Sequence, residues 1–463
     1  MELSQLAHKE ETNGQILKTI FLLAIPAVIE NFFQTILGFV DTLFVSKLGL
    51  VEVSAVGVTN AILAVYFAIF MSIGVAANVF VAKHLGANEK EKANLVCQQS
   101  ILLAAVIGII FGFISLFFAK PLLQLMGVED QVLSSALTYF KIVSIPSILI
   151  SLMFVLGSIL RGTGDTKSPM KVSIMINLLN IALNYVLIFG FFFIPAMGLA
   201  GAAYGTVIAR LIGVIGLFVF LSKSKDISFD FSKWKLDRNM QWKIISLGTP
   251  AAGERLVMRI GQVLYFGLIV ALGTKTFAAH QIAGNIEVFS YMIGYGFAAA
   301  ATTLVGQRLG ANDVAGAKKY ANFSILLGTG IMALFGVFLF LLGEWTAYFF
   351  TNETSVIHEI KIALQIDAFI QPVLAVVLIL TGVYQGAENT KFPMYSTAIG
   401  IWVIRTIGVY LLGIYFGWGI AGIWIAIGFD NLFRAVWLWI NYQNNNWLKH
   451  SDIVPQLGKS RSF

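Results

Sequence analysis

A row of polar side chains lies inside the first long apolar stretch of the chain, near residues 17–46. On a helix, Glu30, Gln34 and Asp41 fall within about 40° of one another. A carboxylate that faces lipid costs at least about 2.5 kcal/mol, so this row is expected to face water or protein. An ionisable residue at such a depth is typical of a proton or cation site. Asp41 is therefore the leading candidate for ion coupling.

A second polar row, made of asparagines, lies in a later apolar stretch near residues 168–193. Asn177, Asn180 and Asn184 share a similar arc of a helix. We expect the two rows to face each other across a cavity, where Asp41 could load a proton outside a membrane and release it inside. Amide oxygens could instead supply some of the oxygen ligands that sodium requires. For the asparagines alone, interhelical hydrogen bonding is the competing explanation, typically worth about 0.6 kcal/mol per pair.

The second half of the chain has its own candidates, on helices near residues 242–271 and 276–306. The set comprises Glu254, Met258, Tyr265, His280 and Glu287. Structural ion pairs with nearby arginines are the leading explanation for the two acids. His280 is expected to be a hydrogen-bonded structural histidine rather than a proton relay.

The composition places these rows in a membrane. Of the 463 residues, 58% are hydrophobic and only 12% are charged, with a mean hydropathy of +0.82. A soluble domain is about half apolar and about a quarter charged. The net charge of +7 is explained by basic residues in short loops, and we expect no nucleic-acid partner. A single cysteine, Cys97, excludes an internal disulfide and gives no metal-site spacing.

Apolar segments long enough to span a bilayer recur along the whole chain. We predict an all-α polytopic membrane protein with twelve transmembrane helices in two pseudo-symmetric six-helix lobes. The predicted spans lie near 17–46, 52–82, 94–118, 132–160, 168–193, 198–222, 242–271, 276–306, 317–343, 355–384, 392–416 and 419–442. The predicted lobes are residues 1–222 and 242–463, joined by a cytoplasmic loop at 223–241. Lysines and arginines concentrate in the loops after even-numbered spans, which predicts that both termini face the cytoplasm.

The chain repeats itself, and the matching motifs are all separated by one and the same offset. LGAN occurs at 85–88 and 309–312, and GTGDTKSPM at 162–170 matches GAENTKFPM at 386–394. Pro-Ala at 26 and 250 and Leu-Gly at 48 and 272 share that offset. Each repeat holds six spans, an even number, so both copies insert in the same orientation. Transporters built this way bind substrate between or within the two halves and rock them.

The two copies differ where ion coupling is expected. Glu30 corresponds to Glu254, but Asp41 corresponds to Tyr265, so the outer carboxylate exists in the first half only. If one half carries the coupling, it should be the first. Pro26 removes a backbone hydrogen bond inside the first span and is either a moving hinge or a static kink.

The chain lacks the elements of an ATPase or of another enzyme. No GxxxxGK[ST] motif is present, and GTGDTKS at 162–168 has the wrong spacing and recurs, which predicts a tight turn. Five scattered histidines and one cysteine do not supply a clustered nucleophile and base or a metal site. We therefore expect no catalytic residue, no metal and no cofactor, and a proton or sodium gradient as the energy source.

Several of these segments together resemble a known family. LAIPAVIENFFQTILGFVDTLFVSKLG at 23–49, RGTGDTKSPM at 161–170, AAHQIAGNI at 278–286 and LGAND at 309–313 are similar to the multidrug and toxic compound extrusion (MATE) family, DinF-like bacterial branch. The resemblance covers nearly the whole chain. It implies two six-helix lobes and cation-driven export of cationic, often aromatic, drugs across the bacterial cytoplasmic (inner) membrane.

The resemblance also implies residue roles. Asp41 is the coupling carboxylate, with Asn180 nearby. Some members have an aspartate where this chain has Asn184, which favours protons over sodium here. Other members have a carboxylate in the seventh span, eight residues after the proline, where this chain has Met258. A sodium site of that kind is therefore not expected in the second half.

A drug cavity is expected around Asp41, lined by Phe33 and Phe154 together with Met258 and Tyr265. The expected partners are organic cations and other drugs and the lipid bilayer, with the protein as a monomer. One alternative is a sodium-coupled exporter, and another is a flippase for a lipid-linked precursor. A flippase should line its cavity with several cations, whereas Arg210 is the main cation within the spans of the first half.

Overall fold

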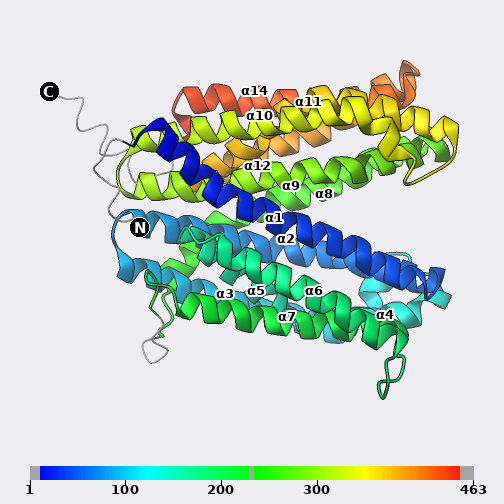
Figure 1. Ribbon diagram of the computed structural model, residues 1–463, viewed down its shortest axis with the longest axis horizontal. Coiled ribbons are helices and arrows are strands. Elements are labelled where there is room, and N and C mark those ends of the chain that lie inside the picture. The colour runs from blue at the N-terminus through cyan, green and yellow to red at the C-terminus, as the bar shows by residue number, and fades with distance from the viewer. Residues whose placement is uncertain (1–10, 229–233, 449–463) are drawn as a thin grey trace. The chain divides into compact units, whose positions relative to one another are not determined.

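The apolar segments form helices, because a helix satisfies its own backbone hydrogen bonds within lipid. The computed structural model describes residues 11–228 and 234–448. Its longer helices are α1 (Asn13–Ser46), α2 (Leu50–Gly86), α3 (Lys90–Leu125), α4 (Asp130–Ser144), α5 (Ser147–Gly162), α6 (Lys167–Phe189), α7 (Gly198–Ser222), α8 (Arg238–Val270), α9 (Thr274–Gly310), α10 (Val314–Ala347), α11 (Thr354–Gly386) and α14 (Gly419–Gln443), shown in Figure 1.

Each of the twelve predicted spans coincides with a helix or with consecutive helices. Within the described residues, ten helices are long and apolar enough to cross a membrane, and the pair α4 and α5, bent by 47°, makes an eleventh. The remaining span is α8, a 33-residue helix that carries Lys243, Glu254 and Arg255 and is not among those ten. The prediction of an all-α polytopic fold is confirmed.

Two spans are not regular α-helices. The span predicted at 132–160 breaks between α4 and α5 at Pro146, which has no backbone N–H to continue a helix. The span predicted at 392–416 comprises α12 (Lys391–Ile399), the π-helix η3 (Gly400–Arg405), α13 (Thr406–Gly408) and the π-helix η4 (Val409–Tyr415). A π-helical turn is wider than an α-helical one and is frequent at functional sites.

The internal repeat is visible in the turns. Asn88 and Asn312, one in each LGAN motif, have φ values of 59° and 58°. Gly164 and Glu388, which occupy equivalent positions in the two copies of the other motif, have φ values of 88° and 62°. This left-handed region is open to glycine and, less readily, to other residues. The GTGDTKS segment thus forms the tight turn that its repetition predicts.

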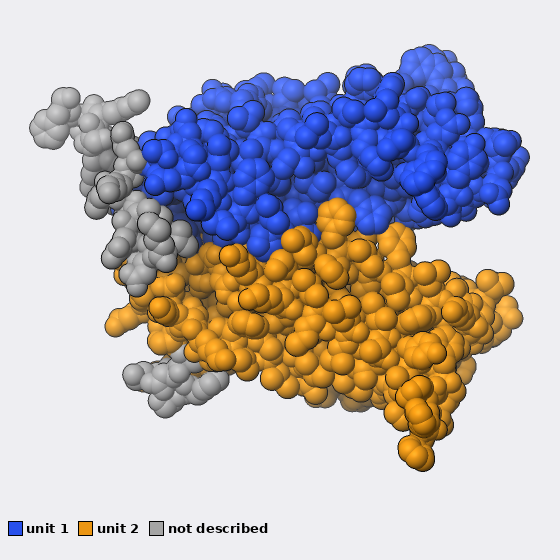
Figure 2. Space-filling model, viewed as in Figure 1, with its two compact units in different colours: residues 1–28, 253–463 blue, residues 29–252 orange. Residues whose placement is uncertain are grey.

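The helices group into two compact units. Unit 1 comprises residues 1–28 and 253–463, and unit 2 comprises residues 29–252; Figure 2 colours them separately. The boundaries after residues 28 and 252 are related by the offset of the repeat and therefore fall at the same place in each copy. The predicted lobes, residues 1–222 and 242–463 with a loop at 223–241, follow the boundaries of the repeats instead. This division into lobes stays a prediction.

The units differ from the repeats because the first parts of α1 and α8 are exchanged. Ile16 and Ile20 of α1 are buried in a core cluster of unit 1 that also contains residues of α9, α10, α11 and α14. Ile244 and Leu247 of α8 are buried in a cluster of unit 2 with residues of α2, α3, α5 and α7. Each unit therefore combines most of one repeat with the beginning of the other.

Candidate functional site

The two predicted polar rows meet in unit 2. The side-chain amide of Asn184 on α6 donates through Nδ2 to Asp41 Oδ1 on α1 at 2.8 Å and to Asn180 Oδ1 at 3.0 Å. Asn180 Nδ2 donates in turn to Thr206 Oγ1 on α7 at 3.3 Å. Three membrane helices thus support one chain of hydrogen bonds that ends at the Asp41 carboxyl group.

Close packing of α6 against α7 positions this chain. Gly205 faces Asn184, and a Cβ atom at Gly205 would overlap Asn184 Oδ1. Asn177, Asn180 and Asn184 are all buried. Asn184 Oδ1 and Asn177 Nδ2 are buried without a hydrogen-bond partner among the described residues. A buried polar atom without a partner calls for an explanation, such as a water or an ion.

Asp41 is only partly buried, which suits exchange with a passing proton or cation. Within the described chain, only its Oδ1 atom receives a side-chain hydrogen bond. Arg210 and Tyr139 lie near enough to interact with it electrostatically. Arg210 Nη1 is buried and makes no hydrogen bond to the described residues. Arg210 therefore offsets part of the Asp41 charge through space, with no hydrogen bond to Asp41 in the described chain.

The other members of the first row have different surroundings. Glu30 forms an ion pair with Arg161 at the end of α5, with Arg161 Nη1 at 3.1 Å from both Glu30 oxygens. Arg161 Nη2 also donates to Ser158 Oγ at 3.1 Å. Gln34 is exposed. In the described chain, no hydrogen bond links Glu30 or Gln34 to Asp41, so the row divides into an ion pair and a separate Asp41 site.

The four predicted drug contacts belong to different units. Phe33 and Phe154 are in unit 2, where Phe154 packs edge-on against Phe67 with ring centroids 5.6 Å apart. Met258 and Tyr265 belong to unit 1. Their joint contribution to one cavity stays a prediction.

Unit 1 contains a buried charged cluster around Asp430, on α14. Arg405 Nη2 pairs with Asp430 Oδ2 at 2.6 Å, and Arg434 Nε pairs with Asp430 Oδ1 at 3.0 Å. Arg405 Nη1 also donates to the hydroxyl of Tyr265 at 3.4 Å. Asp430 is fully buried and the two arginines nearly so. The cluster therefore holds two guanidinium groups for one carboxylate.

A pair of acids lies within electrostatic range of this cluster. Glu287 on α9 interacts with Arg405 and with Asp367 on α11. Asp367 Oδ2 accepts a hydrogen bond from Gln371 Nε2 at 2.7 Å, and Gln371 Oε1 accepts one from Ser290. Glu287 Oε1 and Asp367 Oδ1 are buried and have no hydrogen-bond partner in the described part of the chain. Sequence reasoning found Glu287 but missed Asp367, Arg405 and Asp430.

The remaining candidates of the second half have separate roles. Thr397 Oγ1 donates to Glu254 Oε1 at 3.2 Å. The His280 ring packs against the rings of Phe266 and Trp424, with centroids 5.4 and 5.6 Å apart. His280 Nδ1 is buried with no partner among the described residues, so His280 is packed among aromatic rings rather than held through that atom. Across residues 11–228 and 234–448, no group of three or more His, Cys, Asp or Glu side chains could hold a metal ion.

Comparison with known proteins identifies the family to which this architecture belongs. The MatE family model matches residues 26–186 and 250–411, one match in each repeat. The chain is 30% identical to a probable multidrug resistance protein NorM of Thermotoga maritima, over 97% of this chain and 96% of that protein. It is 29% identical to the uncharacterized transporter YisQ of Bacillus subtilis, over 93% and 95% of the two chains.

A solved structure agrees on the fold. A multidrug resistance MATE family transporter in an outward-facing conformation matches with a TM-score of 0.87, at 23% identity, over 95% of this chain and all of that one. The chain therefore belongs to the MatE family and is a multi-pass membrane transporter, not an enzyme. This confirms the family resemblance, while the DinF-like branch stays a prediction.

Proposed function

We propose that this chain is a proton-coupled multidrug efflux antiporter in which Asp41 is the coupling carboxylate. The observation that supports this most is the hydrogen-bonded chain from Asp41 through Asn184 to Asn180, inside the membrane helices of unit 2. The names of the relatives, multidrug resistance proteins, support small organic compounds as the exported substrates.

Competition between a proton and a drug for the Asp41 carboxyl group would couple proton influx to drug efflux. An ionised Asp41 attracts a cationic drug, whereas a protonated Asp41 is neutral and loses that attraction. Asn184 donates through Nδ2 to Asp41 Oδ1, a bond that the carboxyl group can accept in either protonation state. Proton uptake from outside would thus release the drug there, and proton loss inside would restore the binding form.

Arg210 acts on this switch as a fixed charge. It offsets part of the Asp41 charge in both protonation states of Asp41. The difference in attraction for a cationic substrate therefore comes from the protonation of Asp41. Phe33 and Phe154 of unit 2 would favour apolar and aromatic cations, and Met258 and Tyr265 stay predicted substrate contacts of the second half.

Other parts of the proposal follow from charge distribution and family. We infer a bacterial cytoplasmic (inner) membrane location with both termini in the cytoplasm, from the Lys and Arg bias of the loops and the bacterial relatives. We also infer that the protein is a monomer, that it binds no nucleic acid and that it uses no cofactor other than the coupling ion.

Drug efflux from proteoliposomes tests the coupling. Proton and sodium gradients are imposed separately on wild type, Asp41→Asn and Asp130→Asn. Asp130 is an exposed acid in the first turn of α4 and serves as the matched control. We expect the proton gradient alone to drive efflux by wild type and by the control, and Asp41→Asn to bind drug weakly and to lose coupled efflux.

Two results would redirect the assignment. Efflux driven by sodium alone would favour the alternative of a sodium-coupled exporter, with Asn184 Oδ1 available as an additional oxygen ligand. Normal coupling in Asp41→Asn would exclude Asp41. The buried pair Glu287 and Asp367, together with Glu254 and His280, would then be the next candidates for the coupling site.

The observation in favour of the flippase alternative is that two buried guanidinium groups share the Asp430 carboxylate. A lipid pyrophosphate headgroup would need such cations. Transfer of a fluorescent lipid-linked pyrophosphate between leaflets, with no drug export, would support that alternative and contradict the exporter.

A further inference from the structure

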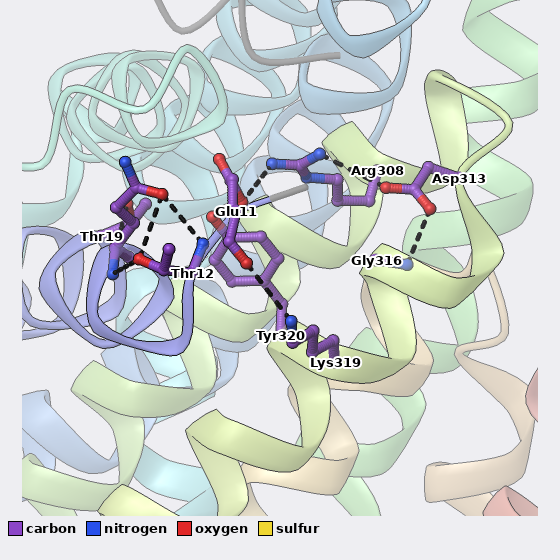
Figure 3. Close-up of polar contacts among 9 residues, drawn as sticks. Glu11, Thr12, Thr19, Arg308, Asp313, Gly316, Lys319 and Tyr320 are labelled. Carbon is purple, nitrogen blue, oxygen red and sulfur yellow. Dashed lines mark hydrogen bonds and ion pairs between the residues drawn. The ribbon is translucent and has the colours of Figure 1, made fainter. Parts of the chain in front are cut away.

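Glu11, two residues before the start of α1, is held tightly in unit 1. The Glu11 carboxylate pairs with Arg308 Nη2 on α9 at 2.7 Å, and its Oε2 atom accepts a hydrogen bond from the Tyr320 hydroxyl on α10 at 2.7 Å. Figure 3 shows Glu11 between these two side chains. The Glu11 side chain is only 6% exposed, although it lies close to the end of the described chain. We call this contact the Glu11 latch.

The residues that hold Glu11 lie at the turn between α9 and α10, where further contacts fix them. Arg308 Nη1 also pairs with Asp313 at 3.3 Å, and the Arg308 guanidinium lies over the Tyr320 ring at 5.1 Å. Asp313 caps α10 by accepting a hydrogen bond from Gly316 N at 2.7 Å. Lys319 Nζ donates to the backbone oxygen of Glu11 at 3.3 Å. Both the side chain and the backbone of Glu11 are therefore fixed.

An equivalent attachment with different chemistry precedes α8 in unit 2. Gln99 Nε2 on α3 donates to the backbone oxygen of Lys235 at 2.7 Å, and Asp237 N donates to Gln99 Oε1 at 3.1 Å. Helix α3 is the counterpart of α10 in the repeat, so the first helix of each repeat is attached at its start to the third helix of the other. One attachment is ionic, and the other uses a neutral amide.

Close backbone approaches continue this symmetry along both exchanged segments. A Cβ atom at Gly296 on α9 would lie 3.1 Å from the backbone oxygen of Ala24 on α1. A Cβ atom at Gly248 on α8 would lie 3.1 Å from the backbone oxygen of Ser72 on α2. The offset of the repeat relates these two contacts, since Ala24 corresponds to Gly248 and Ser72 to Gly296. The exchanged segments are thus bound from their starts to within a few residues of the unit boundaries at 28 and 252.

We propose that the Glu11 latch is a conformational device that keeps residues 11–28, which include the first part of α1, bound in unit 1 during the transport cycle. Residues 29–46 of the same helix belong to unit 2, where the Glu30–Arg161 and Asp41–Asn184 contacts hold them. Any rearrangement of one unit against the other must then deform α1 near the boundary at 28, two residues after Pro26. The latch thereby directs the deformation to the segment that leads to Asp41.

Hydrogen exchange on the purified full-length protein tests the latch without any transport assay. The variants are Glu11→Gln, Tyr320→Phe and Glu91→Gln, the last being an exposed acid in the first turn of α3 that serves as the matched control. We expect Glu11→Gln to speed exchange in residues 13–25 about tenfold, because it removes a charge-assisted bond. Tyr320→Phe should give a smaller increase, and exchange in residues 30–46 should not change.

A double-variant cycle shows whether Glu11 acts through Arg308. In an Arg308→Gln background, Glu11→Gln should add little further acceleration, because the ion pair is already absent. Equal acceleration in both backgrounds would overturn the latch, and so would unchanged exchange of residues 13–25 in Glu11→Gln.

The consequence for export rests on the proposed function and has a separate readout. In proteoliposomes, Glu11→Gln should lower the efflux rate several-fold while drug affinity stays as in wild type, because the Asp41 site is untouched. Faster hydrogen exchange in Glu11→Gln with an unchanged efflux rate would contradict a role of the latch in the transport cycle. Failure of the wild type to export drugs would instead count against the proposed function, and the exchange result would still decide the latch.

Discussion

Tyr265 occupies in the second repeat the position that Asp41 occupies in the first, and the two side chains accept hydrogen bonds from groups of different charge. Asp41 Oδ1 accepts a hydrogen bond from the neutral amide of Asn184 at 2.8 Å, whereas the Tyr265 hydroxyl accepts one from the Arg405 guanidinium at 3.4 Å. Of these two equivalent positions, the first therefore carries an ionisable carboxyl group, and the second carries a hydroxyl group that is bound to an arginine. Duplication of the fold has not duplicated the site.

The arginine of each last helix shows the same divergence. Arg210 on α7 and Arg434 on α14 occupy equivalent positions in the two repeats. Four positions earlier in the chain, the first repeat has Thr206 and the second has Asp430. Arg434 is therefore paired within its own helix. Arg210 is left to act on Asp41 of another helix.

Substitution of Gly205 by alanine should impair coupling through Asn184. The new methyl group would overlap Asn184 Oδ1 and displace the amide that donates to Asp41. A hydrogen bond to a charged group is worth about 1.5–3 kcal/mol, so proton-driven efflux should fall about tenfold or more, as it should in Asn184→Ala. Gly216→Ala is the control, since its Cβ would lie 3.4 Å from Val172, an ordinary contact. Equal efflux by both glycine variants would contradict the role of Asn184.

Removal of the Asp430 carboxylate should destabilise unit 1 more than removal of either arginine. Asp430→Asn leaves Arg405 and Arg434 buried without a counter-ion, and breaking a buried pair costs about 3–5 kcal/mol. Arg405→Gln should cost less, because Arg434 still neutralises Asp430. Apparent melting temperatures in detergent check this order. A higher melting temperature for Asp430→Asn than for Arg405→Gln would show that the cluster is not held together by Asp430.

The turn between α2 and α3 should weaken in acid. Glu89 accepts a hydrogen bond from Lys92 Nζ at 2.7 Å and pairs with His84 at 2.8 Å, and these contacts, Lys92 first, lower the pKa of Glu89 below its usual 4.5. A lowered pKa means that the ionised form is favoured by folding, so the stabilisation is present above about pH 4.5 and is lost as the pH falls through the pKa of the folded state. Because water reaches the Glu89 side chain, the effect should be below about 1 kcal/mol.

Thermal unfolding of wild type and Glu89→Gln at several pH values measures this effect. The wild type should melt at a higher temperature near pH 6, and the difference should disappear near pH 3, where Glu89 is protonated. A difference that persists at the lower pH would mean that Glu89 stabilises the turn by something other than its charge.

The fold and the main polar contact could be predicted from the sequence because each has a strong local signal. Spans follow from hydrophobic length, and the repeat follows from motifs with one offset. Asp41 is recognisable as a charge in an apolar run, and helical periodicity brings Asn180 and Asn184 to one face. The Asp41–Asn184 hydrogen bond lies where these two rows were expected to meet.

Other contacts depend on partners that are distant in sequence. Arg161, which the sequence places in a loop, turns back to pair with Glu30. Arg405 reaches Asp430 from a π-helical segment, whose register differs from the 3.6-residue period used to predict faces. Asp367 and Asp430 carry the same signal as Asp41, an acid in an apolar span, although sequence reasoning did not single them out.

The exchange of the first part of α1 sets an order for assembly during synthesis. Unit 2 is one continuous segment and is complete once residue 252 has been made. The beginning of α1, although made first, finds its partners Arg308 and Tyr320 only after about 300 further residues, roughly 15–60 s later at the usual 5–20 residues per second. By the end of that interval unit 2, to which the start of the chain does not belong, is already complete.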